Sequence, residues 1–183
     1  MPIFLSVSLG WSFTQVGSFL ALWIVGYGIV QSVAPALISR WTGGKAPTGR
    51  AAMVLAFVLA GSMALIPLGL VGGVPSSLTV LVGLGLFGVI FAINSSVHSY
   101  LILAYSHGDE VATNVGFYYM ANAGGRLAGT LLSGIVYQLG GLEACLWTSV
   151  IFSLVAGAIS CGLPRTETGL QLAGMAADGG GSD

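Results

Sequence analysis

Residues 114–140 read NVGFYYMANAGGRLAGTLLSGIVYQLG, and this stretch decides the fold class. It is longer than the run of about 20 predominantly apolar residues that a helix needs to cross a bilayer. In a helix, its polar side chains recur every four residues and form one stripe along the surface. These residues are Asn114, Tyr118, Asn122 and Arg126. An ionisable side chain in the middle of such a segment is costly in lipid, so Arg126 indicates a functional site.

Small residues repeat at the same spacing on an adjoining face of this segment. They are Ala121, Gly125, Gly129 and Ser133. Small residues four apart allow the backbones of two membrane helices to approach closely. We therefore expect a close helix contact here rather than a phosphate-binding loop.

The composition of the whole chain agrees with a membrane protein. The 183 residues are 55% hydrophobic and only 6% charged, and the mean hydropathy is +0.94. Soluble domains carry about 25% charged residues. Five Lys and Arg against six Asp and Glu exclude a basic nucleic-acid surface. The sequence suggests no metal site, no cofactor and no enzymatic carboxylate pair within the apolar segments.

The pattern predicts an all-α helical bundle over residues 1–164, with five full spans and one truncated span. The full spans are 16–38, 51–71, 78–103, 115–139 and 144–163, and residues 1–10 are a partial span. We interpret residues 1–10 as the end of a longer helix, and the chain as a fragment of a longer protein. Residues 165–183 are rich in glycine and lack periodicity, so we expect a disordered tail.

The basic residues outside the spans define an orientation. Five alternating spans place Arg40, Lys45, Arg50 and Arg165 on one side, and the turns on the other side carry no Lys or Arg. Basic residues are enriched in cytoplasmic loops. We therefore expect a multi-pass protein of the bacterial inner membrane with a cytoplasmic carboxyl terminus.

Polar residues of three spans fall at matching depths. Arg126 lies at the middle of its span, with Gln31, Asn94 and Asn122 about 6 Å toward the cytoplasm and His98 and Tyr118 about 12–14 Å. We therefore expect spans 16–38, 78–103 and 115–139 to line a polar cavity, while spans 51–71 and 144–163 face lipid. The candidate substrate-binding residues are Arg126, Asn122, Asn94, Gln31, Tyr118 and His98.

Each of these residues also has a simpler interpretation. A membrane Asn or Gln often joins two helices by a hydrogen bond worth about 1 kcal/mol or less. His98 can bond a backbone carbonyl, and Tyr118 can be a packing residue. Arg126 is different because no carboxylate lies within any span. Its counter-charge comes from chain outside this sequence, from carbonyl groups or from a bound anion, which a planar guanidinium recognises well.

The arrangement resembles the carboxy-terminal half of a major facilitator superfamily transporter, with the first of its six helices largely missing. In that superfamily the third helix of each triplet is peripheral, which matches residues 51–71 and 144–163. Residues 39–45, SRWTGGK, keep the basic and glycine elements of the family's loop signature, but have Ser39 where an acid is common.

More narrowly, residues 10–31 (GWSFTQVGSFLALWIVGYGIVQ) and 114–141 are similar to the ArsJ organoarsenical efflux permeases. That resemblance implies export of 1-arseno-3-phosphoglycerate, a partner glyceraldehyde-3-phosphate dehydrogenase and resistance to arsenate. It also implies a second six-helix half. Two alternatives stay open: a permease for another anionic metabolite or drug, and a half-transporter fragment that does not transport.

Overall fold

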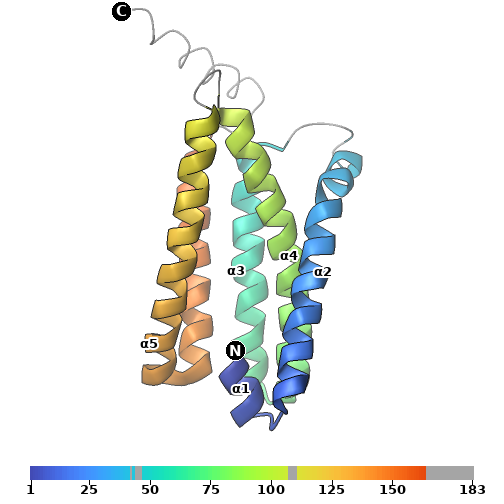
Figure 1. Cartoon of the computed structure of the whole chain (residues 1–183), viewed down its shortest axis with the longest axis vertical. Coiled ribbons are helices and arrows are strands. Elements are labelled where there is room, and N and C mark those ends of the chain that lie inside the picture. Colours follow the sequence, from blue (N-terminus) through green and yellow to red (C-terminus); the bar gives the residue numbers. More distant parts are fainter. Residues whose placement is uncertain (42, 44–46, 107–110, 164–183) are drawn as a thin grey trace, which may run out of the picture.

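The computed structural model describes residues 1–41, 43, 47–106 and 111–163. The regular elements of these residues are helices, which confirms the predicted all-α fold class (Figure 1). In chain order they are α1 (Pro2–Val7), α2 (Phe13–Trp41), α3 (Gly49–Val71), α4 (Ser76–Tyr105) and α5 (Val111–Ser160). The last four are long and apolar enough to cross a membrane.

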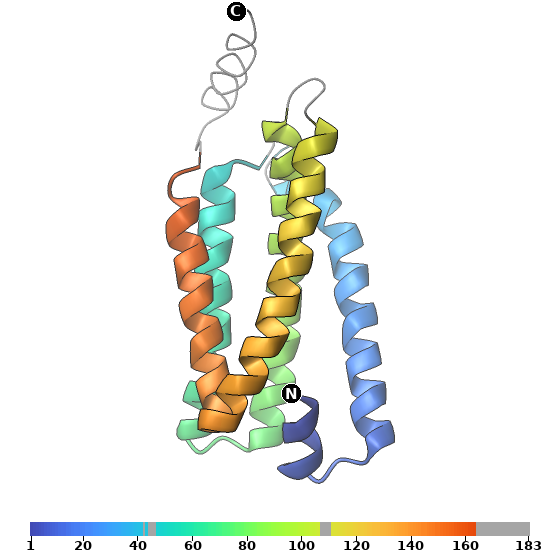
Figure 2. The ribbon, with the colours of Figure 1, turned by 60° about the vertical axis from the view of Figure 1, so that its left-hand side comes forward.

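The helix α5 folds back on itself and passes through the bundle twice. Its 50 residues would extend about 75 Å if straight, far beyond a hydrocarbon core of about 30 Å. The direction reverses at Gly140 (φ −144°, ψ 15°) and Gly141 (φ 66°, ψ −159°), which are not helical. Figure 2 shows the two antiparallel parts, which we call the first arm (111–139) and the second arm (142–160).

The short helix α1 occupies the region interpreted from sequence as the end of a longer helix. It has six residues and packs against α2. Leu5 is fully buried in a hydrophobic cluster that includes Val16 of α2, Ile66 of α3 and Leu146 of the second arm. This cluster ties α1 to the amino-terminal end of α2.

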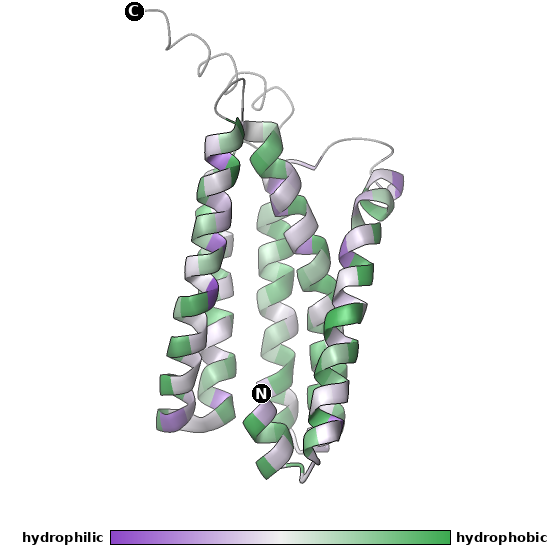
Figure 3. Cartoon of the chain, in the orientation of Figure 1, coloured by the Kyte–Doolittle hydropathy of each residue, from purple (hydrophilic) through white to green (hydrophobic). Residues whose placement is uncertain are grey.

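The helix α3 packs against both α4 and α5 and is the most buried of the long helices. Alanines four residues apart, Ala52, Ala56 and Ala60, are buried along one side of it. Its other side is exposed, with Val58 and Leu65 on the surface. Figure 3 shows α3 almost uniformly apolar, whereas hydrophilic positions recur on α2, α4 and α5.

The two ends of the bundle differ in charge. Arg40 lies in the last turn of α2 and Arg50 in the first turn of α3, so we call this the basic end, which is uppermost in Figure 1. The opposite end, which we call the turn end, holds the turn after α3 and the reversal in α5. Lys45, Arg165, the acidic pair 109–110 and the predicted tail 165–183 lie outside the described residues.

Candidate functional site

Four aromatic rings stack between α2 and α4 near the middle of both helices. Trp23 lies 6.0 Å from Tyr27, Tyr27 lies 5.5 Å from Phe91, and Phe91 lies 5.5 Å from Phe87, measured between ring centroids. The planes of each pair are inclined by 28° or less. Such offset stacks stabilise an interface by about 0.5–1.5 kcal/mol per pair beyond their buried area.

The Trp23 indole also fixes how closely the two helices approach. Its Nε1–H donates to the carbonyl of Leu84 at 2.9 Å. A Cβ placed on Gly88 would lie 3.1 Å from the indole ring, so a glycine leaves room for Trp23. The sequence analysis did not predict this stack. The repeated spacing of four residues, Trp23 to Tyr27 and Phe87 to Phe91, is the signal that would have revealed the stack.

Toward the basic end, α2 and α4 are joined by a hydrogen bond between side chains. The Nε2 of Gln31 donates to Oγ of Ser95 at 3.3 Å. The neighbouring Asn94 has a different environment: its Oδ1 is buried and has no partner among the described residues. The Gln31 side chain thus joins α2 to α4, whereas the buried side-chain oxygen of Asn94 lacks a hydrogen-bond donor among the described residues.

His98 is held by its own helix. Its Nδ1 lies 2.9 Å from the backbone carbonyl of Asn94, four residues earlier. A carbonyl is only an acceptor, so Nδ1 carries the hydrogen in the neutral ring and Nε2 is the free acceptor. This is the backbone contact that the sequence analysis gave as the simpler interpretation of His98.

Tyr118 connects the first arm of α5 to α4. Its hydroxyl lies 3.5 Å from Oγ of Ser99, at the long limit of a hydrogen bond. The ring of Tyr118 also packs against Tyr119, with 5.6 Å between centroids. Because α4 and α5 share few contacts, this polar contact marks where the two helices meet.

Arg126 and Asn122 lie on the exposed part of the first arm. Within the described residues, the guanidinium of Arg126 makes no ion pair and no hydrogen bond; only its backbone carbonyl is engaged, by Thr130. Glu143, the carboxylate nearest in sequence within the described chain, lies beyond the reversal at the turn end. The positive charge at the middle of the first arm is therefore unpaired within the described chain.

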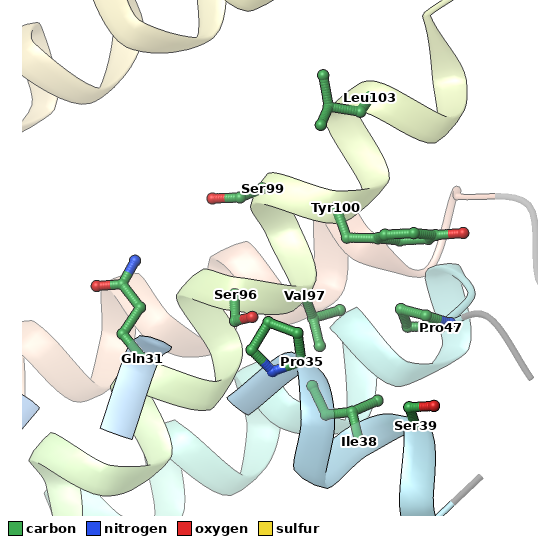
Figure 4. Close-up of a pocket in the computed structure, with 10 residues that line it drawn as sticks. All are labelled: Gln31, Pro35, Ile38, Ser39, Pro47, Ser96, Val97, Ser99, Tyr100 and Leu103. Carbon is green, nitrogen blue, oxygen red and sulfur yellow. The ribbon is translucent and has the colours of Figure 1, made fainter. Parts of the chain in front are cut away.

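A cavity of about 500 Å³ opens between α2 and α4 toward the basic end. Figure 4 shows the residues around it: Gln31, Pro35, Ile38, Ser39, Pro47, Ser96, Val97, Ser99, Tyr100 and Leu103. Of the six predicted site residues, only Gln31 lines this cavity. A second predicted residue, Tyr118, lies near the cavity because its hydroxyl contacts Ser99, which lines the cavity.

The expected close contact at the small-residue face of α5 is not present at Gly125 and Gly129, although the Ser133 carbonyl of the same face accepts a hydrogen bond from Cys145 Sγ of the second arm at 3.4 Å. Around an ideal Cβ on Gly125 or Gly129 there is nothing within 4 Å. The two glycines instead line a groove of about 670 Å³ between the two arms. Close approach occurs elsewhere: a Cβ on Gly83 of α4 would clash with Ile66 of α3, and one on Gly157 would press on Phe57.

The structure does not bring the six predicted residues together in one closed cavity. Gln31 bonds Ser95, the chain neighbour of Asn94, at the α2–α4 interface, and Tyr118 contacts Ser99 of α4 from the first arm. Among the packed helix pairs, α2 contacts α1 and α4, whereas α5 contacts mainly α3. Within the described residues, no side-chain hydrogen bond joins Asn122 or Arg126 to the other four.

Four helices are long and apolar enough to cross a membrane, and one of them folds back on itself, which defines a polytopic helical membrane protein. The sequence profile of the Major Facilitator Superfamily matches residues 1–177. The chain therefore belongs to the Major Facilitator Superfamily, a family of membrane transporters rather than enzymes. Comparison with curated proteins and with solved structures gives no match.

Proposed function

We propose that this transporter moves a small organic anion and that Arg126 holds the anion. The observation that carries the proposal is the unpaired guanidinium on the exposed first arm, at the middle of a membrane pass. Charged side chains at this depth face a bundle interior or an aqueous cavity and find a partner there. A guanidinium binds phosphate or carboxylate oxygens with two parallel hydrogen bonds, which gives strength and orientation.

The neighbouring polar groups support the same assignment. Asn122 lies one helical turn from Arg126 on the same stripe and can donate a hydrogen bond to a bound oxyanion. Gln31 and Asn94 would add contacts from α2 and α4, since Asn94 keeps an unpaired carbonyl oxygen. Tyr118 and His98 would line the cytoplasmic approach. Transport would proceed by rocking of this unit against a second six-helix half around the site.

For the substrate we propose 1-arseno-3-phosphoglycerate, exported across the bacterial inner membrane with the carboxyl terminus in the cytoplasm. The support is the resemblance of residues 10–31 and 114–141 to the ArsJ permeases. A glyceraldehyde-3-phosphate dehydrogenase would supply this substrate, and its export would give arsenate resistance. The phosphate, arsenate and carboxyl-derived oxygens of the molecule suit an unpaired arginine.

The test is the arsenate tolerance of sensitive cells that carry the protein as its own gene encodes it, together with the dehydrogenase. We expect Arg126→Ala to abolish the gain in tolerance and Arg126→Lys to restore little, because an ammonium lacks the planar fork. Arg50→Ala, at the basic end, is the matched control and should keep the tolerance. Full tolerance in Arg126→Ala at equal membrane levels would contradict the anion site. Loss in all three variants would point to assembly instead.

A further inference from the structure

The groove between the two arms of α5 is open along its small-residue floor. It measures about 670 Å³, and an added Cβ on Gly125 or Gly129 would have nothing within 4 Å. At the turn end the arms touch, where Sγ of Cys145 donates to the Ser133 carbonyl at 3.4 Å. Figure 2 shows the arms separating from the reversal toward the basic end. From Val136 to Gly125 the groove runs about 16 Å along the first arm, roughly half the hydrocarbon thickness.

The surface of the groove is apolar, and its hydrogen-bond donors are already engaged. Each lining hydroxyl or thiol donates to a backbone carbonyl of α5, and no lining residue carries a formal charge. These donors are Ser133, Cys145, Thr148 and Ser149. A site for a polar molecule would present free donors, so the groove suits an apolar occupant.

The spacing of the small residues suits a helix. Gly125, Gly129 and Ser133 follow one another every four residues, which lets a second helix backbone approach closely. The described helices meet in this way elsewhere, since the lack of a side chain on Gly83 of α4 leaves room for Ile66 of α3. The first arm offers the same kind of surface without a partner among the described residues.

The short helix α1 lies at the turn end of the groove. Met1 and Phe4 pack against the hydrophobic cluster that includes Leu5 of α1 and Leu146 of the second arm. Leu146 directly follows Cys145, which lines the groove. Figure 1 shows the amino-terminal end of α1 directed into the bundle, toward the basic end. A helix that extended α1 upstream would therefore continue an existing contact with the second arm.

The packing of α4 shows the same arrangement with its helix in place. The six elements form two groups of three: α1, α2 and α3, then α4, the first arm and the second arm. The helix α4 opens the second group and packs on α2 and α3, the last two helices of the first group. Transporters often contain repeats of this kind. The corresponding partners of the first helix of the first group are the two arms of α5.

We propose that the groove between the two arms is the docking site of an apolar transmembrane helix that ends in α1. Residues 1–10, which the sequence indicates as the end of a longer helix, are then its last turns. Because Arg126 directly follows Gly125 in the chain, the docked helix lies beside the proposed anion site. The docking rests on packing and does not depend on the identity of the substrate.

The experiment is disulfide crosslinking in the protein as its own gene encodes it, with Cys145→Ala and Cys161→Ala as background. Ser149→Cys places one thiol in the groove, and single cysteines are introduced at each of the roughly eleven positions before residue 1 that span its length. We expect disulfides within one polypeptide at upstream positions three or four apart, the spacing of one helix face. Ile151→Cys is the matched control on the exposed side of the second arm and should give none.

A second measurement uses the floor of the groove. Gly129→Leu fills the docking surface and should lower the melting temperature in detergent by about 3 °C or more, as overpacking does. Gly134→Leu should not, because Gly134 is equally open but does not line the groove. Equal melting of these two variants would contradict the docking site.

Three other outcomes would also overturn the docking site. They are disulfides between two polypeptides, which would make a second copy the occupant, equal crosslinking of Ile151→Cys and Ser149→Cys, and a gene product that begins at residue 1. Arg126→Ala should keep the crosslinks, since the guanidinium takes no part in the packing. Failure of the anion site and failure of the docking site are therefore distinguishable.

Discussion

Among single residues, the two tryptophans Trp23 and Trp41 show how position decides the role of the same side chain. Trp23 lies partly buried in the middle of α2, stacks on Tyr27 and bonds the carbonyl of Leu84. Trp41 ends the same helix and is 78% exposed. In lipid the hydrophobic effect does not drive helices together, so stacking and hydrogen bonds of the Trp23 kind hold the interface.

We expect Trp23→Ala to destabilise the protein by about 1–3 kcal/mol, the sum of a lost stack and a lost membrane hydrogen bond. Thermal unfolding in detergent measures the effect, and it should appear as a lower melting temperature. Trp41→Ala is the control, because it removes the same atoms from an exposed helix end. If both variants melt alike, the aromatic stack does not hold α2 on α4.

Among the elements, the packing of α5 depends on the reversal of chain direction at Gly140 and Gly141. Its two arms run through the bundle in opposite directions because Gly141 has φ 66° and ψ −159°. That region of backbone space is essentially restricted to glycine, and other residues there are strained by about 1–3 kcal/mol. The second arm buries Leu146 and Val150 against the rest of the bundle, so the reversal determines a large part of the packing.

Gly141→Ala should therefore lower the unfolding free energy by about 1–3 kcal/mol. Gly134→Ala, within the first arm, should not, because Gly134 has nothing within 4 Å of an added Cβ and alanine favours helix. Unfolding of both variants in the same detergent compares them directly. A neutral Gly141→Ala would mean that the reversal relaxes without strain.

At the scale of the whole molecule, the helices that carry the aromatic stack and Arg126 pack on different partners: α2 packs on α4, and α5 packs mainly on α3. The polar residues predicted to share one cavity are distributed over α2, α4 and the first arm of α5. This arrangement fits the proposal that a second six-helix unit completes the transport pathway.

The proposed orientation is tested by cysteine labelling, in a protein with Cys145→Ala and Cys161→Ala as background. Thr113→Cys lies at the basic end, and Ser77→Cys lies at the turn end. A membrane-impermeant maleimide should label Ser77→Cys in intact spheroplasts and Thr113→Cys only in inverted vesicles. The reverse pattern would place the basic end outside the cytoplasm.

The class of the protein and the position of its central charge follow from the amino-acid sequence. Apolar segments of about 20 residues must satisfy their own backbone hydrogen bonds in lipid, so a helical bundle follows from composition and length. The same reasoning places Arg126 near the middle of a pass. The α2–α4 aromatic stack is also visible in the sequence as a repeated spacing of four residues, which the sequence analysis did not use.

Which helices meet, and where their polar groups point, depends on the packing of the whole bundle. Most faces of these helices are apolar enough to contact lipid, so hydrophobicity alone does not determine which helices pack together. The helix pairs are determined by close fit between side chains, as where Gly83 leaves room for Ile66 and Gly157 leaves room for Phe57. For the same reason the small-residue face at Gly125 and Gly129 borders a groove instead of a helix.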